Sequence, residues 1–109
     1  MSYLGPVIVT GRLIVQSYLG RNVGRKGLAA AKRQFDAWLA EAEQAAWSDP
    51  MAVKARYATA SILKGGRVVF NISGNNYRLI VKINYRAGVV DIRFFGTHGE
   101  YDRIDAETV

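Results

Sequence analysis

Residues 67–83 read RVVFNISGNNYRLIVKI, two alternating apolar segments joined by a polar turn. Every second residue in each segment is apolar and mostly β-branched or aromatic, which is typical of paired strands, and Gly74-Asn75-Asn76 suits a tight turn. Similar segments lie on either side of this hairpin. The predicted strands span residues 59–64, 67–73, 77–85 and 89–95. Their short connections favour an antiparallel meander, because parallel neighbours need long crossovers.

The first half of the chain predicts helical structure. Within residues 27–47, apolar side chains recur every three or four positions: Leu28, Ala31, Phe35, Trp38, Leu39, Ala42 and Ala46. Ser48-Asp49-Pro50 ends this helix, and Val7–Val9 predicts a short first strand. Residues 11–19 fit either a helix capped by Thr10 or a strand at 13–15, and propensity favours the strand. Helical material followed by a sheet predicts an α+β fold.

Composition narrows the classes of function. The 109 residues suit a single domain, 1–109, and the absence of Cys excludes disulfides, thiolate zinc sites and cysteine nucleophiles. No stretch approaches the roughly 20 apolar residues of a membrane helix, and no signal peptide is evident, so we expect a cytoplasmic protein without a membrane partner. With one His and scattered carboxylates, we expect no metal site and no cofactor.

Positive charge is concentrated in the strand region. The chain carries a formal charge of +6, and residues 51–97 hold eight Lys or Arg against one Asp. Such a segment suits a polyanion, because each neutralised phosphate releases counterions. The alternative is a solvated face that only aids solubility.

Alternation along the predicted strands separates a core face from a basic face. The core face is expected to carry Val68, Phe70, Ile72, Leu79, Val81, Ile83, Ile92 and Phe94. The opposite face is expected to carry Arg67, Asn71, Arg78, Lys82 and Arg93, with Val69, Ile80 and Phe95 between them. A basic sheet face with an interleaved aromatic predicts a surface that binds RNA, whereas the alternative is an ordinary solvated face.

The last strand runs into residues 97–102, THGEYD. His98 lies between Gly96 and Gly99, beyond the end of the strand and three residues before Tyr101. His is the side chain whose unperturbed pKa allows proton transfer in both directions near neutrality. The catalytic interpretation competes with a structural one, in which Thr97 or His98 only caps a short helical turn.

These segments resemble the HigB family, RelE-like toxins of bacterial type II toxin–antitoxin systems. The resemblance rests on the run through residues 67–83 and on THGEYD, and it extends over about residues 28–106. It implies a RelE-like fold, in which an N-terminal strand and two helices pack on a curved antiparallel sheet. It therefore favours a helix at residues 11–19.

The resemblance also implies a function: an mRNA endoribonuclease that acts on ribosome-bound messages, inhibits translation and is neutralised by a HigA-type helix-turn-helix antitoxin. The expected catalytic residues are His98, Tyr101, Arg78, Arg93 and Lys82. Among them, His98 would act as acid or base, Tyr101 would orient it or carry the second proton, and Arg78 and Arg93 would clamp the scissile phosphate. The expected RNA-binding residues are Lys54, Arg56, Lys64, Arg67 and Asn71.

Two other classes of function fit the same residues. One is an RNA- or ribosome-binding module, or a catalytically inactive toxin relative that retains antitoxin binding. The other is a structural partner of a DNA-binding antitoxin. Loss of toxicity on replacing His98 distinguishes the catalytic hypothesis from both.

Overall fold

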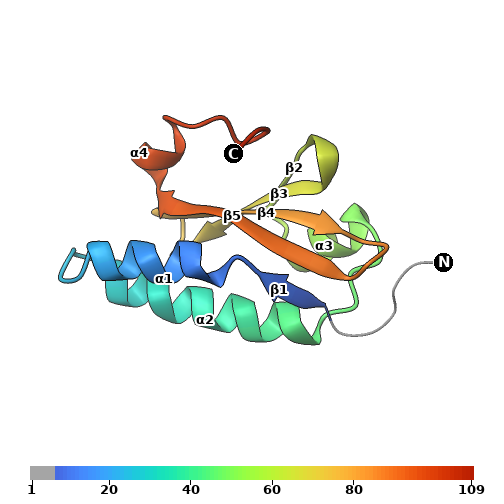
Figure 1. The fold of residues 1–109 in the computed structure, drawn as a ribbon, viewed down its shortest axis with the longest axis horizontal. Coiled ribbons are helices and arrows are strands. Elements are labelled where there is room, and N and C mark those ends of the chain that lie inside the picture. The colour runs from blue at the N-terminus through green and yellow to red at the C-terminus, as the bar shows by residue number, and fades with distance from the viewer. Residues whose placement is uncertain (1–6) are drawn as a thin grey trace.

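The computed structural model describes residues 7–109 and shows a five-stranded sheet with its long helices on one face (Figure 1). The elements, in chain order, are β1 (Ile8–Thr10), α1 (Arg12–Arg21), α2 (Leu28–Gln44), α3 (Pro50–Arg56), β2 (Ser61–Ile62), the 3-10 turn η1 (Lys64–Gly66), β3 (Arg67–Ile72), β4 (Tyr77–Asn84), β5 (Val89–Thr97) and α4 (His98–Tyr101). The predicted α+β class is confirmed.

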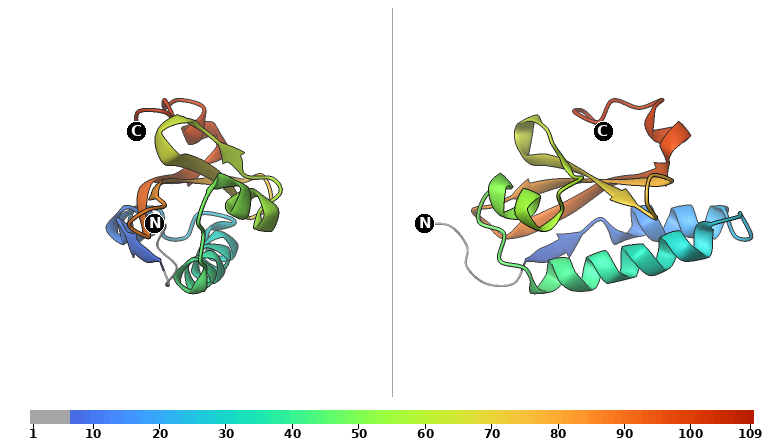
Figure 2. Two further views of the ribbon diagram at one scale, coloured as in Figure 1. Left: turned by 90° about the vertical axis from the view of Figure 1, so that its right-hand side faces the viewer. Right: turned by 180° about the vertical axis from the view of Figure 1, so that it is seen from behind.

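The sheet has the order β1-β5-β4-β3-β2. Strands β2 to β5 pair as the predicted antiparallel meander, although β2 is only two residues long. Strand β1 lies beside β5 and runs parallel to it. Helices α1 and α2 occupy one face of the sheet, while α4 and the C-terminal segment lie on the other (Figure 2).

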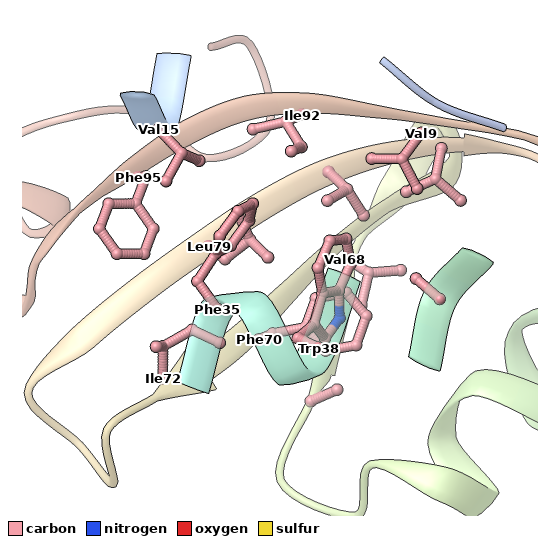
Figure 3. Packing of buried hydrophobic residues seen from close by; sticks show 14 of the residues in the cluster. Val9, Val15, Phe35, Trp38, Val68, Phe70, Ile72, Leu79, Ile92 and Phe95 are labelled. Atoms are coloured by element: carbon pink, nitrogen blue, oxygen red, sulfur yellow. The ribbon is translucent and has the colours of Figure 1, made fainter. Parts of the chain in front are cut away.

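The core lies between the helices and the sheet (Figure 3). Helix α2 presents Phe35 and Trp38 to this layer, and Trp38 packs against Phe70 of β3 with ring centroids 5.4 Å apart. Each such side chain contributes about 1.5–3 kcal/mol of hydrophobic stabilisation when fully buried. The predicted core faces of β3 and β4 are confirmed, with Val68, Phe70, Ile72, Leu79, Val81 and Ile83 all buried.

Residues 12–21 form helix α1, so the strand that propensity favoured is wrong. A strand would place Leu13 and Val15 on the same face, whereas Val15 is buried and Leu13 is 73% exposed. Val15 and Tyr18 instead share the buried side of a helix. Gly11 permits the reversal from β1 into α1: its φ is +79°, and a Cβ there would lie 2.5 Å from the carbonyl oxygen of Ile92.

Two further expectations need correction near the end of α2. The helix stops at Gln44, before the predicted residue 47. Asp49 and Pro50 do not merely end it but begin the unpredicted helix α3, in which the Asp49 carboxylate accepts from the Ala52 N–H at 2.9 Å. A capping Asp followed by Pro at the first helical position is a start signal.

Strand β5 also departs from the predicted alternation of side chains between the two faces of the sheet. Ile80 pairs with Phe94 but Val81 pairs with Ile92, so Arg93 is an extra residue in β5. This β-bulge reverses the side-chain alternation beyond it. Phe95 therefore packs in the core and Phe94 does not, the opposite of the prediction.

Candidate active site

Helix α4 positions His98 and Tyr101 at the end of β5. The Thr97 hydroxyl accepts from the Glu100 N–H at 3.1 Å, and the Glu100 carboxylate accepts from the Thr97 N–H at 2.8 Å. This reciprocal pair is a capping box, which the T-x-x-E spacing in THGEYD encodes. His98 and Tyr101 are three residues apart and so project from neighbouring positions of the same turn. The structural and the catalytic interpretations of the motif are thus compatible.

Glu100 also joins α4 to helix α1. Its Oε1 accepts from the Tyr18 hydroxyl at 2.6 Å, and the Arg25 guanidinium lies 3.8 Å away. Burial alone would raise the pKa of Glu100, but the hydrogen bonds from Tyr18 and Thr97 and the charge of Arg25 lower it below its usual value. Burial, followed by the bond to Glu100, raises the pKa of Tyr18. These anchors were not predicted, because only the fold brings residue 18 to residue 100.

Arg78 is the buried cation of the site. It is 8% exposed, and its Nη1 donates to the main-chain oxygens of Asn75 at 2.9 Å and Tyr77 at 3.2 Å. Its Nη2 donates to the Asn75 side-chain oxygen at 3.0 Å. No carboxylate among residues 7–109 lies within 4.0 Å of it. A buried charge without a counter-charge is costly, so this guanidinium is suited to an external anion.

Arg78, His98 and Tyr101 form one cluster, called the His98 cluster below. The Arg78 Nη2 lies 3.3 Å from the His98 Nδ1, and its guanidinium carbon lies 5.6 Å from the centroid of the Tyr101 ring. Because a guanidinium only donates, the His98 Nδ1 accepts, and a neutral ring carries its proton on Nε2. That nitrogen lies 3.6 Å from the Asp102 carboxylate. The imidazole is 55% exposed, so a ligand can reach it.

Arg93 and Arg67 gather at a different place from Arg78. The Arg93 Nε and the Arg67 Nη2 both donate to the main-chain oxygen of Val109, at 3.2 and 2.7 Å, and Arg93 also pairs with Asp91. Lys82 lies opposite Arg67 in the strand register. Arg78 and Lys82 are four residues apart on β4, which is about 13 Å along a strand. The structure thus places Arg93 with Arg67 and separates Lys82 from Arg78.

The predicted basic face of the sheet is not fully exposed to solvent. The C-terminal segment after α4 turns back over this side of the sheet (Figure 1) and ends at Arg67 and Arg93. Val69 and Ile80, which were expected between the cations, are 3% and 0% exposed. The face is therefore divided, with the His98 cluster at one end and Arg67 with Lys82 at the other.

The remaining predicted RNA-binding residues take different positions. Asn71 pairs with Arg78 in the sheet register and so lies near the His98 cluster, and Lys64 lies in η1. Lys54 and Arg56 belong to α3. Lys54 donates to the Ala60 carbonyl, and Arg56 pairs with Glu41 of α2, so neither contacts the cluster.

Residues 7–109 contain neither a cluster of metal ligands nor a membrane-spanning helix. No three His, Cys, Asp or Glu side chains come together there as metal ligands. In this range, no helix has the length and apolar character to span a membrane.

Comparison with known proteins identifies one family. A family model described as HigB_toxin, RelE-like toxic component of a toxin-antitoxin system, matches residues 31–104. This match includes α4 and the strands that carry the basic side chains. No curated protein matches the chain.

Proposed function

Because the chain belongs to the HigB toxin family, the RelE-like toxic components of toxin–antitoxin systems, we propose that it is an endoribonuclease that cleaves ribosome-bound mRNA and so inhibits translation. The observation that carries this proposal is the buried Arg78, which has no carboxylate partner among the described residues and lies against His98 and Tyr101. Together they offer an anion site beside a group that transfers protons. Both accelerate the cleavage of RNA by its own 2′-oxygen.

The reaction can be written with side chains of this cluster. A base removes the proton of a ribose 2′-OH, and the oxygen attacks the adjacent phosphorus. The bond to the 5′-oxygen breaks, an acid protonates that oxygen, and the products are a 2′,3′-cyclic phosphate and a 5′-hydroxyl. We assign one proton transfer to His98, with Tyr101 orienting it or carrying the other proton. No step in this assignment requires a cofactor.

Arg78 is assigned to the phosphate. Its planar guanidinium can donate two parallel hydrogen bonds to phosphate oxygens and oppose the charge that develops in the transition state. The Asn75 contacts hold it in place, so little reorganisation is needed when substrate binds. When Arg78 engages the phosphate, the His98 Nδ1 is freed from it. Lys82 and Arg93 extend the positive potential along the same side of the sheet.

Membership of this toxin family also indicates a protein partner. A toxin of a toxin–antitoxin system has an antitoxin, and we propose a HigA-type helix-turn-helix protein in that role. Co-expression with the toxin should restore growth, and the two chains should purify together. An antitoxin that restores growth without binding the toxin would contradict this part of the proposal.

Replacing His98 tests the catalytic assignment. Wild-type and His98→Ala proteins are expressed in a bacterial host, growth is followed, and mRNA 5′ ends are mapped by primer extension. We expect growth arrest with discrete cuts in translated messages, both lost in the variant. The imidazole is 55% exposed, so the variant should keep the wild-type Tm. Arrest without cuts would indicate an RNA or ribosome binder, and arrest that persists in the variant would remove His98 from the site.

A further inference from the structure

A second polar site lies at the other end of β4 from the His98 cluster. A cavity of 470 Å³, open to solvent, is lined by the turn before β3, the end of β4 and the first residues after it. That volume falls in the range of small-ligand sites. Arg67, Lys82 and Arg86 line it, and no carboxylate does. The cavity thus has the charge of an anion site.

Arg67 is the buried member of this group. It is 9% exposed, and its Nε has no hydrogen-bond partner among residues 7–109. Its Nη2 already holds an oxygen acceptor, the main-chain oxygen of Val109, which it shares with Arg93. The Nε is itself buried and out of reach of a ligand, so Arg67 contributes to the cavity through its charge. A phosphate group would balance that charge.

Neutral polar groups also line the cavity. Tyr85 is among the lining residues, although its hydroxyl is itself buried without a hydrogen-bond partner in the described part of the chain. Burial raises the pKa of Tyr85, and the charge of Asp49 raises it further, so the hydroxyl stays protonated. Asn84 uses its side-chain oxygen to accept from the Ala87 N–H, which leaves its amide N–H groups for a ligand. The amide of Asn84 suits the edge of a nucleobase or a ribose.

We infer that this cavity binds a nucleotide of the RNA flanking the cleaved bond, with its phosphate held by Arg67, Lys82 and Arg86. The inference rests on the proposed function, because it takes the RNA that the His98 cluster would cleave as the ligand. About 13 Å of β4 separates the two sites, so the ligand that fills both is an oligonucleotide. Such a subsite would set the register of the message on the enzyme.

Salt-dependent binding tests this subsite. The probe is a single-stranded RNA oligonucleotide with 2′-O-methyl groups, which the enzyme cannot cleave because the attacking oxygen is blocked. Its affinity for the full chain is measured by fluorescence anisotropy over a range of salt. The variant is Lys82→Gln with Arg86→Gln, and the control is Lys26→Gln with Arg33→Gln, which removes the same charge outside the cavity.

The salt slope decides the outcome. Each lost phosphate contact to a single strand reduces the slope of log K against log salt by about 0.7, so the cavity variant, which loses its hold on one phosphate, should lose up to about 0.7 and bind several-fold more weakly. The control should keep the wild-type slope. Equal slopes for the cavity variant and the control would overturn the subsite. Cleavage of unmodified RNA by wild type reports separately on the proposed function, which that result would leave standing.

Discussion

Removing one hydroxyl should loosen the helix that carries His98. Tyr18 is 5% exposed, and its hydroxyl donates to Glu100 at 2.6 Å while accepting from Arg25 at 2.7 Å. Tyr18→Phe removes both hydrogen bonds and keeps the ring, which packs edge-on against Phe95 with centroids 5.3 Å apart. The substitution therefore isolates the polar link between α1 and α4.

The expected cost follows from the surroundings of Glu100. Hydrogen bonds to a charged group contribute about 1.5–3 kcal/mol, and the Glu100 side chain is 38% exposed, so solvent screening favours the lower end. We expect Tyr18→Phe to lower the free energy of unfolding by about 1.5 kcal/mol. For a domain of this size, that corresponds to a fall in Tm of about 6–12 °C.

Thermal and urea unfolding measure this change, and Tyr85→Phe is the matched control. The Tyr85 hydroxyl is buried but has no hydrogen-bond partner among residues 7–109, so its removal should change the Tm little or raise it slightly. Equal destabilisation by both variants would refute the reasoning, because the loss would then reflect burial rather than the bond to Glu100.

The effect of Tyr18→Phe should depend on pH. The folded-state pKa of Glu100 lies below its usual value of 4.5, so its interactions stabilise the fold above that value. This stability is lost as the pH falls through the folded-state pKa. The difference between wild type and Tyr18→Phe should therefore be full at neutrality and shrink below pH 4.5, as unfolding followed across that range will show. A difference that grows on acidification would contradict the assignment to ionised Glu100.

Three further substitutions test the site and its support. Thr97→Ala removes the hydroxyl that caps α4 and should lower stability by about 1 kcal/mol in urea unfolding, together with the cleavage rate. Gly66→Ala should lower the free energy of unfolding by about 2 kcal/mol or more, because φ is +80° and the new Cβ would lie 2.5 Å from the Ile83 carbonyl oxygen. Gly74→Ala, also at positive φ but in open space, should lower it less. Arg78→Lys keeps the charge but loses the planar fork, so single-turnover cleavage should fall about 10²–10³-fold while RNA affinity at low salt changes much less.

The antiparallel sheet could be predicted because local pattern and tertiary role agree there. Residues 67–83 alternate with period two, the turns carry the residues that tight turns require, and each core side chain of β3 and β4 is buried as expected. Helix α2 was predictable for the same reason, since its apolar spacing and its buried face coincide. Helix α3 could also have been found, because Asp49-Pro50 is a start signal as well as a stop signal.

Other parts depend on contacts that local patterns do not record. Residues 13–15 have strand propensity, yet they form a helix, because one helical side buries Val15 and Tyr18 against the sheet. The bulge at Arg93 reverses Phe94 and Phe95, since an extra residue in one strand shifts every later side chain to the other face. A period-two reading cannot detect such an insertion.

The sequence by itself determined which side chains are available for chemistry: a single His beside a Tyr, on a capped turn, and an excess of cations along the strands. The tertiary structure alone decided which of these side chains lie close together. It brings Arg78 to His98 across neighbouring strands, places Arg93 with Arg67 instead, and lays the C-terminal segment over the face between them. Charge and spacing are properties of the sequence, whereas these contacts between side chains depend on strand register, one bulge and a long-range hydrogen bond between residues 18 and 100.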